Sequence, residues 1–360
     1  MAEEKRDISV VNIKINKQSI KETPELTKLI ETINKNQDID ARNLLPKASW
    51  YHVEFQLNNT YVGFANGIRR MLVEELPVYC LTIDDADIET DDEFILNDML
   101  TKNLNLLPII QEIKNANDLD TIDDIKAHLD IHNNTNEIID VLSGDIKISG
   151  TSVIDKNIIL YRLRPGRFLK MKKIYVVRGF SKYNAAKFSL FNNIRYRPLD
   201  HKPFDIKNNT GERSIKVDPT SFFFSFTTCG NIEVETVFKL LHSQLITRLN
   251  RILESFKEYA KEAGKKYYIT ANLTVSNEDD IYLYKIPNEY ITLSTMIAQK
   301  CLLLNPQIAY VAANIERYDN EVAMIKIRDL NANKILIAAT MECIDDVNYL
   351  YKELTRGIKN

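Results

Sequence analysis

The chain has 360 residues, of which 44% are hydrophobic, enough to fill the cores of two or three domains. Its net charge is −3 with both signs mixed along the sequence, so composition gives no reason to expect binding to nucleic acid or membrane. The four cysteines lie far apart without a CxxC pair, which disfavours a disulfide framework or a zinc site. Neither a long apolar run nor a signal-peptide core is present, so we expect an intracellular protein that is not secreted.

Nucleotide-binding loops are also missing from the sequence. Glycine accounts for only 10 residues, and neither GxxxxGK[ST] nor GxGxxG occurs. Residues 1–46 are predicted to form an N-terminal extension. Within it, residues 9–15 alternate like an edge strand, and Thr23-Pro24 is typical of a helix start.

The most informative stretch is residues 53–77, VEFQLNNTYVGFANGIRRMLVEELP. Residues 53–57 alternate as in a half-buried strand, and residues 58–60 offer side-chain oxygens that favour a helix start. A helical period follows and ends at Pro77. Gly63 and Gly67, four residues apart, would let a neighbouring backbone come close. The apolar face of this helix comprises Phe64, Ile68, Met71 and Leu72.

FANGIRRMLVEELP closely resembles the assembly motif of the alpha-type subunits of DNA-dependent RNA polymerases, namely bacterial alpha, archaeal D and the eukaryotic third-largest subunit. The resemblance implies a dimeric platform for the two large catalytic subunits, with no catalytic residue of its own. It also implies that many relatives hold zinc or an iron–sulfur cluster with cysteines of the inserted subdomain. This chain has no cysteine between Cys80 and Cys229, so no metal or cofactor is expected. The resemblance further implies contact with the second-largest subunit through Asn66, Arg69, Arg70 and Glu74. The alternative is that Arg70 and Glu74 form an ordinary exposed i, i+4 ion pair.

An acidic segment follows a predicted strand at residues 78–83. Seven acidic residues lie between Asp84 and Glu93, and His128 and His132 are spaced to share a helix face. Together they would serve a metal-dependent enzyme. The alternative, which we favour, is a solvated acidic hairpin and solvent-facing histidines. The continuation DEFILNDMLTKNLNLLPI predicts a helix ending at Pro108, with a face comprising Phe94, Ile95, Met99, Leu104, Leu106 and Leu107, and it resembles the motif that opens the family's inserted subdomain.

A strongly basic stretch covers residues 162–187, in LYRLRPGRFLKMKKIYVVRGFSKYNAAKFS. A turn is predicted at Pro165-Gly166 and a strand around residues 174–177. Its charges with interleaved aromatic residues are also typical of a nucleic-acid-binding surface, which is the main alternative function. The stretch resembles a family segment that faces the large subunits, so protein docking is favoured over a solvated surface. The docking residues implied there are Arg178, Lys182 and Lys187.

The remaining sequence predicts the end of one unit and the whole of another. Residues 221–227 form an apolar run expected to be buried on both faces, and a long helix follows over residues 237–259. Strands are then predicted at 267–275 and 281–286, a helix capped by Thr292, strands at 308–315 and 322–328, and a helix at 336–354. The first part resembles the family's dimerisation subdomain. The second resembles the small partner subunit, the eukaryotic eleventh subunit or archaeal L.

These observations define one set of expectations. The fold is predicted to be α+β, with two alpha-subunit-like dimerisation units, the first interrupted by a mostly β insert. The expected divisions are an extension at 1–46, the first unit at 47–84 and 217–265, the insert at 85–216 and the second unit at 266–360. The two units are expected to pair within the chain, without a homodimer. The predicted contact comprises Gly63, Phe64, Gly67, Ile68, Met71 and Leu72 against Leu293, Met296, Ile297 and Cys301.

The resemblance further implies partners and a source. The partners would be the largest and second-largest polymerase subunits and a small tenth-type subunit, with DNA reached only through the complex and no membrane contact. A fused pair of this kind points to a large DNA virus. The expected location is then the viral factory in the host cytoplasm and the virion, and otherwise the nucleus or cytoplasm.

Overall fold

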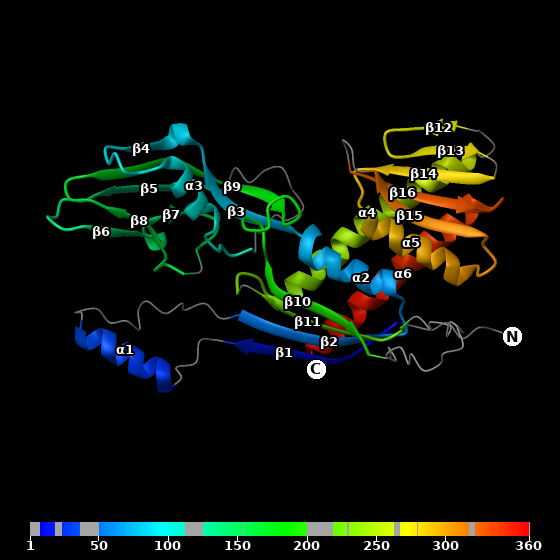
Figure 1. Cartoon of the computed structure of the whole chain (residues 1–360), viewed down its shortest axis with the longest axis horizontal. Coiled ribbons are helices and arrows are strands. Elements are labelled where there is room, and N and C mark those ends of the chain that lie inside the picture. Colours follow the sequence, from blue (N-terminus) through cyan, green and yellow to red (C-terminus); the bar gives the residue numbers. More distant parts are fainter. Residues whose placement is uncertain are drawn as a thin grey trace, which may run out of the picture.

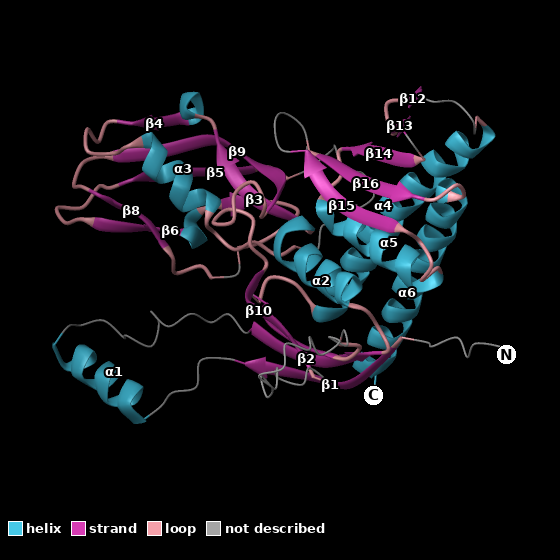
Figure 2. Ribbon diagram, turned by 45° about the vertical axis from the view of Figure 1, so that its right-hand side comes forward, coloured by secondary structure: helices cyan, strands magenta, loops and turns pink. Residues whose placement is uncertain are grey.

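The described part of the computed structural model has three larger sheets and a two-stranded hairpin, with helices packed between and beside them (Figures 1 and 2). The predicted α+β class is confirmed. The structure describes residues 8–18, 24–36, 50–111, 125–153, 155–199, 219–228, 230–262, 267–278, 280–316 and 321–359. The expected divisions after residues 46, 216 and 265 fall outside these ranges, as does Cys229.

The first sheet has four antiparallel strands in the order β1 (Ser9–Gln18), β2 (Trp50–Asn58), β11 (Phe222–Thr228) and β10 (Phe191–Pro198). The prediction of an edge strand at residues 9–15 is confirmed. The prediction that residues 221–227 are buried on both faces is wrong, because the exposure of β11 alternates along its length. Helix α4 (Val234–Lys261) covers one face only, where Phe238 meets Phe55 and Phe226 edge-on at 6.3 Å between ring centroids. The predicted helix at residues 24–33 is confirmed as α1 (Pro24–Asn36).

Helix α2 (Val62–Arg70) follows β2 and continues into a π-helical turn, Met71–Glu75. The expectation that residues 58–60 cap it is wrong: Tyr61 stands at the N-cap, without a side-chain hydrogen bond to the helix. The helix ends before Pro77, as predicted. Since a π turn holds one residue more than an α turn, it changes which side chains face inward, and Glu75 becomes buried.

The insert has its own sheet, in the order β3 (Pro77–Ile83), β9 (Phe168–Phe180), β5 (Ala127–His132) and β7 (Lys147–Ile148), with β4 (Ile88–Thr90) also pairing with β9. A separate hairpin joins β6 (Ile139–Leu142) to β8 (Ile159–Leu163). These strands and α3 (Asn97–Asn105) enclose a second hydrophobic core. Strand β3 contributes to both cores: Val78 and Cys80 to the main core, Leu81 and Ile83 to that of the insert.

Two expectations for the insert need correction, and a third is confirmed. The face predicted for α3 is right only in part. Ile95, Leu104 and Leu107 are buried as expected, and Leu100 is buried with them. Phe94, Met99 and Leu106 are exposed instead. His128 and His132 lie on strand β5 rather than on a helix, although both are exposed as expected. An i, i+4 spacing puts two residues on one face of either element, so it could not decide between them. The turn at Pro165-Gly166 is confirmed, with Gly166 at φ 70°.

The second unit has a five-stranded sheet in the order β12 (Tyr267–Ile269), β13 (Thr274–Glu278), β14 (Ile281–Pro287), β16 (Val322–Arg328) and β15 (Tyr310–Glu316). Helices α5 (Ile291–Leu304) and α6 (Ala332–Lys359) pack beside it. The single strand expected at 267–275 is two strands, because the chain turns at Thr270 and Leu273. Thr292 does not cap α5; Tyr290 stands at its N-cap. The strand at 322–328 and the last helix are confirmed.

The two units share one topology. The order β2, α2, β10, β11, α4 is repeated as β14, α5, β15, β16, α6, and the sheet order β1-β2-β11-β10 is repeated as β13-β14-β16-β15. Both long helices have 28 residues. Sheet membership differs from the expected boundaries at three strands. Strand β1, expected in the extension, and β10, expected in the insert, belong to the first unit's sheet, and β3 pairs in the insert's sheet. The long helices lie side by side between the two sheets (Figure 1).

Candidate functional site

The two units meet where α2 crosses α5, and the two glycines of α2 lie at this crossing. A Cβ atom on Gly67 would lie 2.5 Å from Sδ of Met296, closer than real Cβ atoms come to other atoms. The backbone N–H of Gly63 donates a hydrogen bond to Oε1 of Gln299 at 2.6 Å. The missing side chains thus let the two helices approach closely, which offsets the roughly 0.5–1 kcal/mol that a glycine costs inside a helix.

Tyr61 connects three helices at one end of this crossing. Its hydroxyl donates to the backbone oxygen of Met296 at 3.3 Å and lies 3.4 Å from Sγ of Cys343. Burial, with smaller contributions from Cys343 and Asp346, raises the pKa of Tyr61 well above its usual value, so the hydroxyl stays protonated. The tyrosine therefore acts as a neutral hydrogen-bonding link between the units.

The apolar side chains predicted for this contact are all buried in one continuous core. Helices α4 and α6 lie against each other beside it, where Nδ2 of Asn333 donates to the backbone oxygen of Phe256 at 3.1 Å. The His242 ring also stacks on Tyr351, with ring centroids 4.4 Å apart. The buried members from the predicted set are Phe64, Ile68, Met71, Leu72, Leu293, Met296, Ile297 and Cys301.

A buried charged cluster lies at the other end of the crossing, and sequence analysis did not predict it. Arg248 of α4 reaches Glu289 through Nη2 at 2.6 Å and Glu75 through Nη1 at 2.5 Å. Arg251 adds a bond to Glu289 at 2.6 Å, and the Thr292 hydroxyl donates to Glu75. Glu75 and Glu289 are only 3% and 1% exposed. Burial alone would lower the pKa of Arg248, but the charges and hydrogen bonds of Glu289 and Glu75 hold it above its usual value.

Four of the predicted docking residues lie on or just after α2. Arg69 donates through Nε to Oδ1 of Asn66 at 3.0 Å. Arg70 pairs with Glu74 at 3.0 Å, and both side chains are about one-quarter to one-third exposed. The i, i+4 pair considered as an alternative therefore exists, and it is half-buried rather than fully solvated. The four residues thus form two pairs, Arg69 with Asn66 and Arg70 with Glu74.

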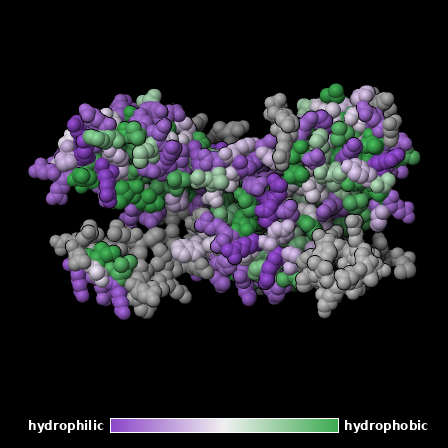
Figure 3. Space-filling model, viewed as in Figure 1, coloured by the Kyte–Doolittle hydropathy of each residue, from purple (hydrophilic) through white to green (hydrophobic). Residues whose placement is uncertain are grey.

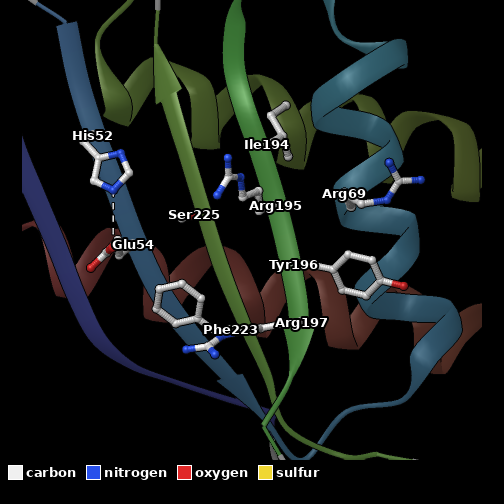
Figure 4. Close-up of a pocket in the computed structure, with 9 residues that line it drawn as sticks. All are labelled: His52, Glu54, Arg69, Ile194, Arg195, Tyr196, Arg197, Phe223 and Ser225. Carbon is white, nitrogen blue, oxygen red and sulfur yellow. Dashed lines mark hydrogen bonds and ion pairs between the residues drawn. The ribbon is translucent and has the colours of Figure 1, made fainter.

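Arg69 also borders a groove on the outer face of the first sheet (Figure 4). Arg195 and Arg197 project from β10 onto this face, and the guanidinium of Arg197 lies 5.2 Å from the ring centroid of Phe223. Arg69 itself lies 5.9 Å from the ring centroid of Tyr196. These residues were not among those that the sequence analysis singled out. The only available signal was the alternation of Arg195, Tyr196 and Arg197. The other lining residues are His52, Glu54, Ile194 and Ser225.

The basic stretch 162–187 is matched by carboxylates along much of its length. Arg164 pairs with the buried Asp92 at 2.6 Å, Arg162 with Asp140 at 3.1 Å, and Lys170 with Asp130 at 3.2 Å. Further pairs join Arg167 to Asp91 and Lys172 to Glu89. The expected acidic hairpin is wrong, because β4 pairs with β9. Its expected solvation is confirmed for Asp84, Asp85, Glu89 and Glu93, which are exposed, whereas Asp92 is buried. The ion pairs leave fewer positive charges available to phosphates than the sequence suggests.

The remaining predicted docking residues lie at the end of this stretch. Lys182 pairs with Glu321 of the second unit at 2.9 Å and lies 3.8 Å from the ring centroid of Tyr290. Lys182 is thus engaged within the chain, with only 15% of its side chain exposed. The guanidinium of Arg178 lies over Phe180 at 5.5 Å, and Lys187 over Phe188 at 5.4 Å. Burial raises the pKa of the Cys80 thiol to about 12, and nearby Lys187 offsets this only in part.

Two other kinds of site are not found among the described residues. These residues contain no group of three or more His, Cys, Asp or Glu side chains placed to hold a metal ion. Across the same residues, no helix is both long and apolar enough to cross a membrane. Polar and apolar residues alternate over the face in Figure 3, with apolar groups visible on the insert and beside the second sheet.

Known proteins similar to this chain are alpha-type subunits of DNA-directed RNA polymerase, and the resemblance predicted from the motifs is confirmed. The DNA-directed RNA polymerase II subunit rpb3 of Dictyostelium discoideum is 24% identical over 151 residues, covering 36% of this chain and 49% of the relative. Subunit 3 of DNA-directed RNA polymerases II, IV and V of Arabidopsis thaliana is 26% identical over 161 residues, covering 37% and 50%.

An archaeal relative matches over more of its length. The DNA-directed RNA polymerase subunit Rpo3 of Pyrobaculum islandicum is 25% identical over 246 residues, covering 56% of this chain and 92% of the relative. The chain spans about half the length of the two eukaryotic relatives. No family model matches the chain.

Proposed function

We propose that this chain is a non-catalytic assembly subunit of a multisubunit DNA-directed RNA polymerase, in which its two units pair within one polypeptide. The observation that carries the proposal is the α2–α5 crossing, where the motif shared with the alpha-type subunits packs against a second unit of the same topology. The polymerase subunit names of the similar proteins support the same role. RNA synthesis itself would be the work of the large subunits.

The second unit takes the place of a separate eleventh-type partner in this proposal. Two free subunits lose translational and rotational freedom when they pair, whereas a tether makes pairing intramolecular at about millimolar effective concentration. A homodimer is then unnecessary. The proposed divisions follow the sheets: the extension, a first unit with β1, β2, β10, β11, α2 and α4, an insert from β3 to β9, and a second unit from β12 to α6.

Docking of the second-largest subunit is assigned to the surface that bears Asn66, Arg69, Arg70 and Glu74, together with the adjoining groove of Arg195 and Arg197. Arg178 and Lys187 of the insert extend this surface. Lys182 is left out because it pairs with Glu321. The largest subunit and a small tenth-type subunit are the further proposed partners, with DNA reached only through the complex. The proposed location is the nucleus or cytoplasm, and the viral factory and virion if the source is a large DNA virus.

Nucleic-acid binding through residues 162–187, the alternative function, loses support from the ion pairs that neutralise much of that stretch. The proposal is tested by affinity purification of the tagged chain from its native source, followed by mass spectrometry. Two chains larger than this one, recovered in equal amount to it, would support the platform role. Recovery of the chain alone, or with nucleic acid only, would refute it.

The docking surface needs a separate test with the same purification. The Arg69→Ala, Arg70→Ala double variant should lose the second-largest subunit while the chain stays folded. The matched control is Arg162→Ala, since Arg162 is an exposed arginine of the insert, paired with Asp140. Equal recovery of the large subunit by the double variant and the control would refute the assigned surface.

A further inference from the structure

The shared topology of the two units lets their residues be compared position by position. Tyr61 and Tyr290 are the N-caps of α2 and α5, and Gly67 and Met296, which touch at the centre of the crossing, each lie six residues after that tyrosine. Arg248 and Asp346 each lie 14 residues after the first residue of their 28-residue helices, since 234 + 14 = 248 and 332 + 14 = 346. The crossing therefore has an approximate two-fold axis through Gly67 and Met296.

This axis relates the two ends of the crossing, and one equivalent position has opposite charge at the two ends. At one end, which we call the arginine end, Arg248 and Arg251 of the first unit face Glu289 of the second unit, with Glu75 beside them. At the other end, which we call the lysine end, Asp346 occupies the position of Arg248 and pairs with Lys300 at 2.6 Å. Glu289 corresponds to Thr60, since each immediately precedes the N-cap tyrosine.

Both ends are electrically balanced in the observed pairing. The arginine end holds two arginines against two glutamates, and the lysine end holds one lysine against one aspartate. Most of these groups are largely buried: Glu75 and Glu289 are at most 3% exposed, and the side chains of Lys300, Asp346 and Arg248 are 13%, 15% and 19% exposed. Arg251 lies at the rim, with 38% of its side chain exposed. A charge left without a partner among the buried groups is costly, so this balance discriminates between possible pairings.

Pairing of like units would destroy the balance. Two first units would bring Arg248 and Arg251 against Thr60 in place of Glu289, leaving one excess positive charge at each end of the crossing. Two second units would bring Glu289 against Asp346 with only Lys300 to compensate, leaving one excess negative charge at each end. We propose that this inverted charge pattern makes each unit select the other kind of unit and reject a copy of itself. The residues that determine this selectivity are Arg248, Glu289, Asp346 and Lys300.

The proposal rests on the intramolecular pairing within the proposed function, and not on the polymerase role. It concerns specificity rather than strength alone, because replacing a buried ion pair by apolar residues often leaves stability intact. The test must therefore ask which units choose each other. No large subunit is needed, so a negative result would leave the assembly role untouched, and failure of that role would leave this result standing.

The experiment uses the full chain with two reversals of charge. Arg248→Glu leaves three carboxylates against Arg251, and Glu289→Arg leaves three cations against Glu75. Each variant is expressed with two different affinity tags, either with itself or with the other variant, and complexes are recovered by consecutive purification on both tags. The matched control reverses an exposed pair of the insert, Arg162→Glu with Asp140→Arg.

Opposite variants should exchange units and be recovered together as a dimer. The expected preference over like pairs is more than about a hundredfold, because each arginine end of a like pair keeps two uncompensated charges, whereas the opposite pair balances both ends. A chain with both reversals should regain balance and remain a monomer that captures no second copy. If the single variants are insoluble alone, recovery of soluble protein only on co-expression of opposite variants is the same positive result. Equal recovery of like and unlike pairs, or exchange by the control pair, would overturn the proposal.

Discussion

The two units of this chain have the same strand and helix order, yet they are not interchangeable. The first carries an insert between α2 and β10, whereas α5 leads to β15 through a few residues around Pro306. Where the first unit has glycines on its crossing helix, the second has Thr292 and Met296 at the equivalent positions. The glycines of the first unit leave room on α2, and larger side chains of α5, such as Met296, occupy that room. Similar topology thus allows a two-fold pairing, and differences at equivalent positions decide which pair forms.

The largest effect is expected at two equivalent isoleucines. Ile68 and Ile297 each lie seven residues after the N-cap tyrosine, and neither is exposed. We expect Ile68→Asp and Ile297→Asp each to lower the free energy of unfolding by more than about 4 kcal/mol, because an unpaired carboxylate would be buried in the shared core. Chemical denaturation measures this loss. Leu303→Asp on the exposed side of α5 is the control. A similar loss for this variant would mean that the two buried isoleucines are not special to the contact between the units.

The next largest effect is a difference in stability cost between substitutions at the arginine end and at the lysine end. We expect Arg248→Ala to cost about 3–5 kcal/mol, because it leaves Glu75 and Glu289 with Arg251 alone. Asp346→Ala should cost less, about 2 kcal/mol, because only Lys300 loses its partner and its amine lies 5.5 Å from the Tyr61 ring centroid. Denaturation of both variants gives the ratio. Equal losses would mean that the two ends contribute alike and that the asymmetry has no energetic consequence.

A pH effect is expected in the insert, which only the first unit carries. Burial would raise the pKa of Asp92, but hydrogen bonds from Arg164 and the Phe94 N–H outweigh burial and hold the pKa below its usual value. A carboxyl with a lowered folded pKa stabilises the fold above its unfolded pKa of about 3.9, and this contribution disappears as the pH falls through the folded pKa. Asp92→Asn should therefore cost about 1–2 kcal/mol at pH 7.

The cost of Asp92→Asn should stay constant down to about pH 5 and shrink below pH 4. Unfolding free energies of both proteins at several pH values measure this trend. An Asp140→Asn variant, at an exposed ion pair, should show almost no difference at any pH. A penalty for Asp92→Asn that grew on acidification would contradict the assignment.

The smallest effect concerns the contact between the insert's basic segment and the second unit. A double-mutant cycle of Lys182→Ala and Glu321→Ala should give a coupling of about 1 kcal/mol, because Lys182 is largely buried and also lies over the Tyr290 ring. The exposed pair Lys170–Asp130 should give about half of this or less. Hydrogen exchange at residues 181–184 should accelerate in the Lys182→Ala variant. Unchanged exchange and zero coupling would mean that this contact contributes nothing.

Most helices and strands could be predicted because their hydrophobic period was clear. The change from period two to period 3.6 between Phe55 and Phe64 identified β2 and α2, and the repeat along the last helix identified α6. The apolar members of the helix crossing followed from the same pattern. Misplaced features were mostly local: Thr292 has a capping residue's chemistry, but its hydroxyl binds Glu75 inside the interface.

The charged part of the site could not be predicted, since its members come from distant places in the chain. Arg248 lies on α4 and Glu289 just before α5, 41 residues further along the chain. Nothing in the sequence around either residue indicates that they form a pair. Glu75 looked like one of two equivalent glutamates, and only the π-helical turn made it the buried one. Arg195 and Arg197 were missed because the eight-residue strand β10 is mostly polar and gives little hydrophobic signal.

Strand β3 gives the insert a property that a flexible linker would not provide. Its first half packs in the main core through Val78 and Cys80, and its second half in the insert's core through Leu81 and Ile83, while β9 pairs with it from Pro77 to Ile83. The insert can therefore move relative to the main core only by bending this paired ribbon, and not by rotating about a flexible hinge. The insert thus keeps a fixed orientation relative to the paired helices, and a protein bound to the insert would be held in that orientation too.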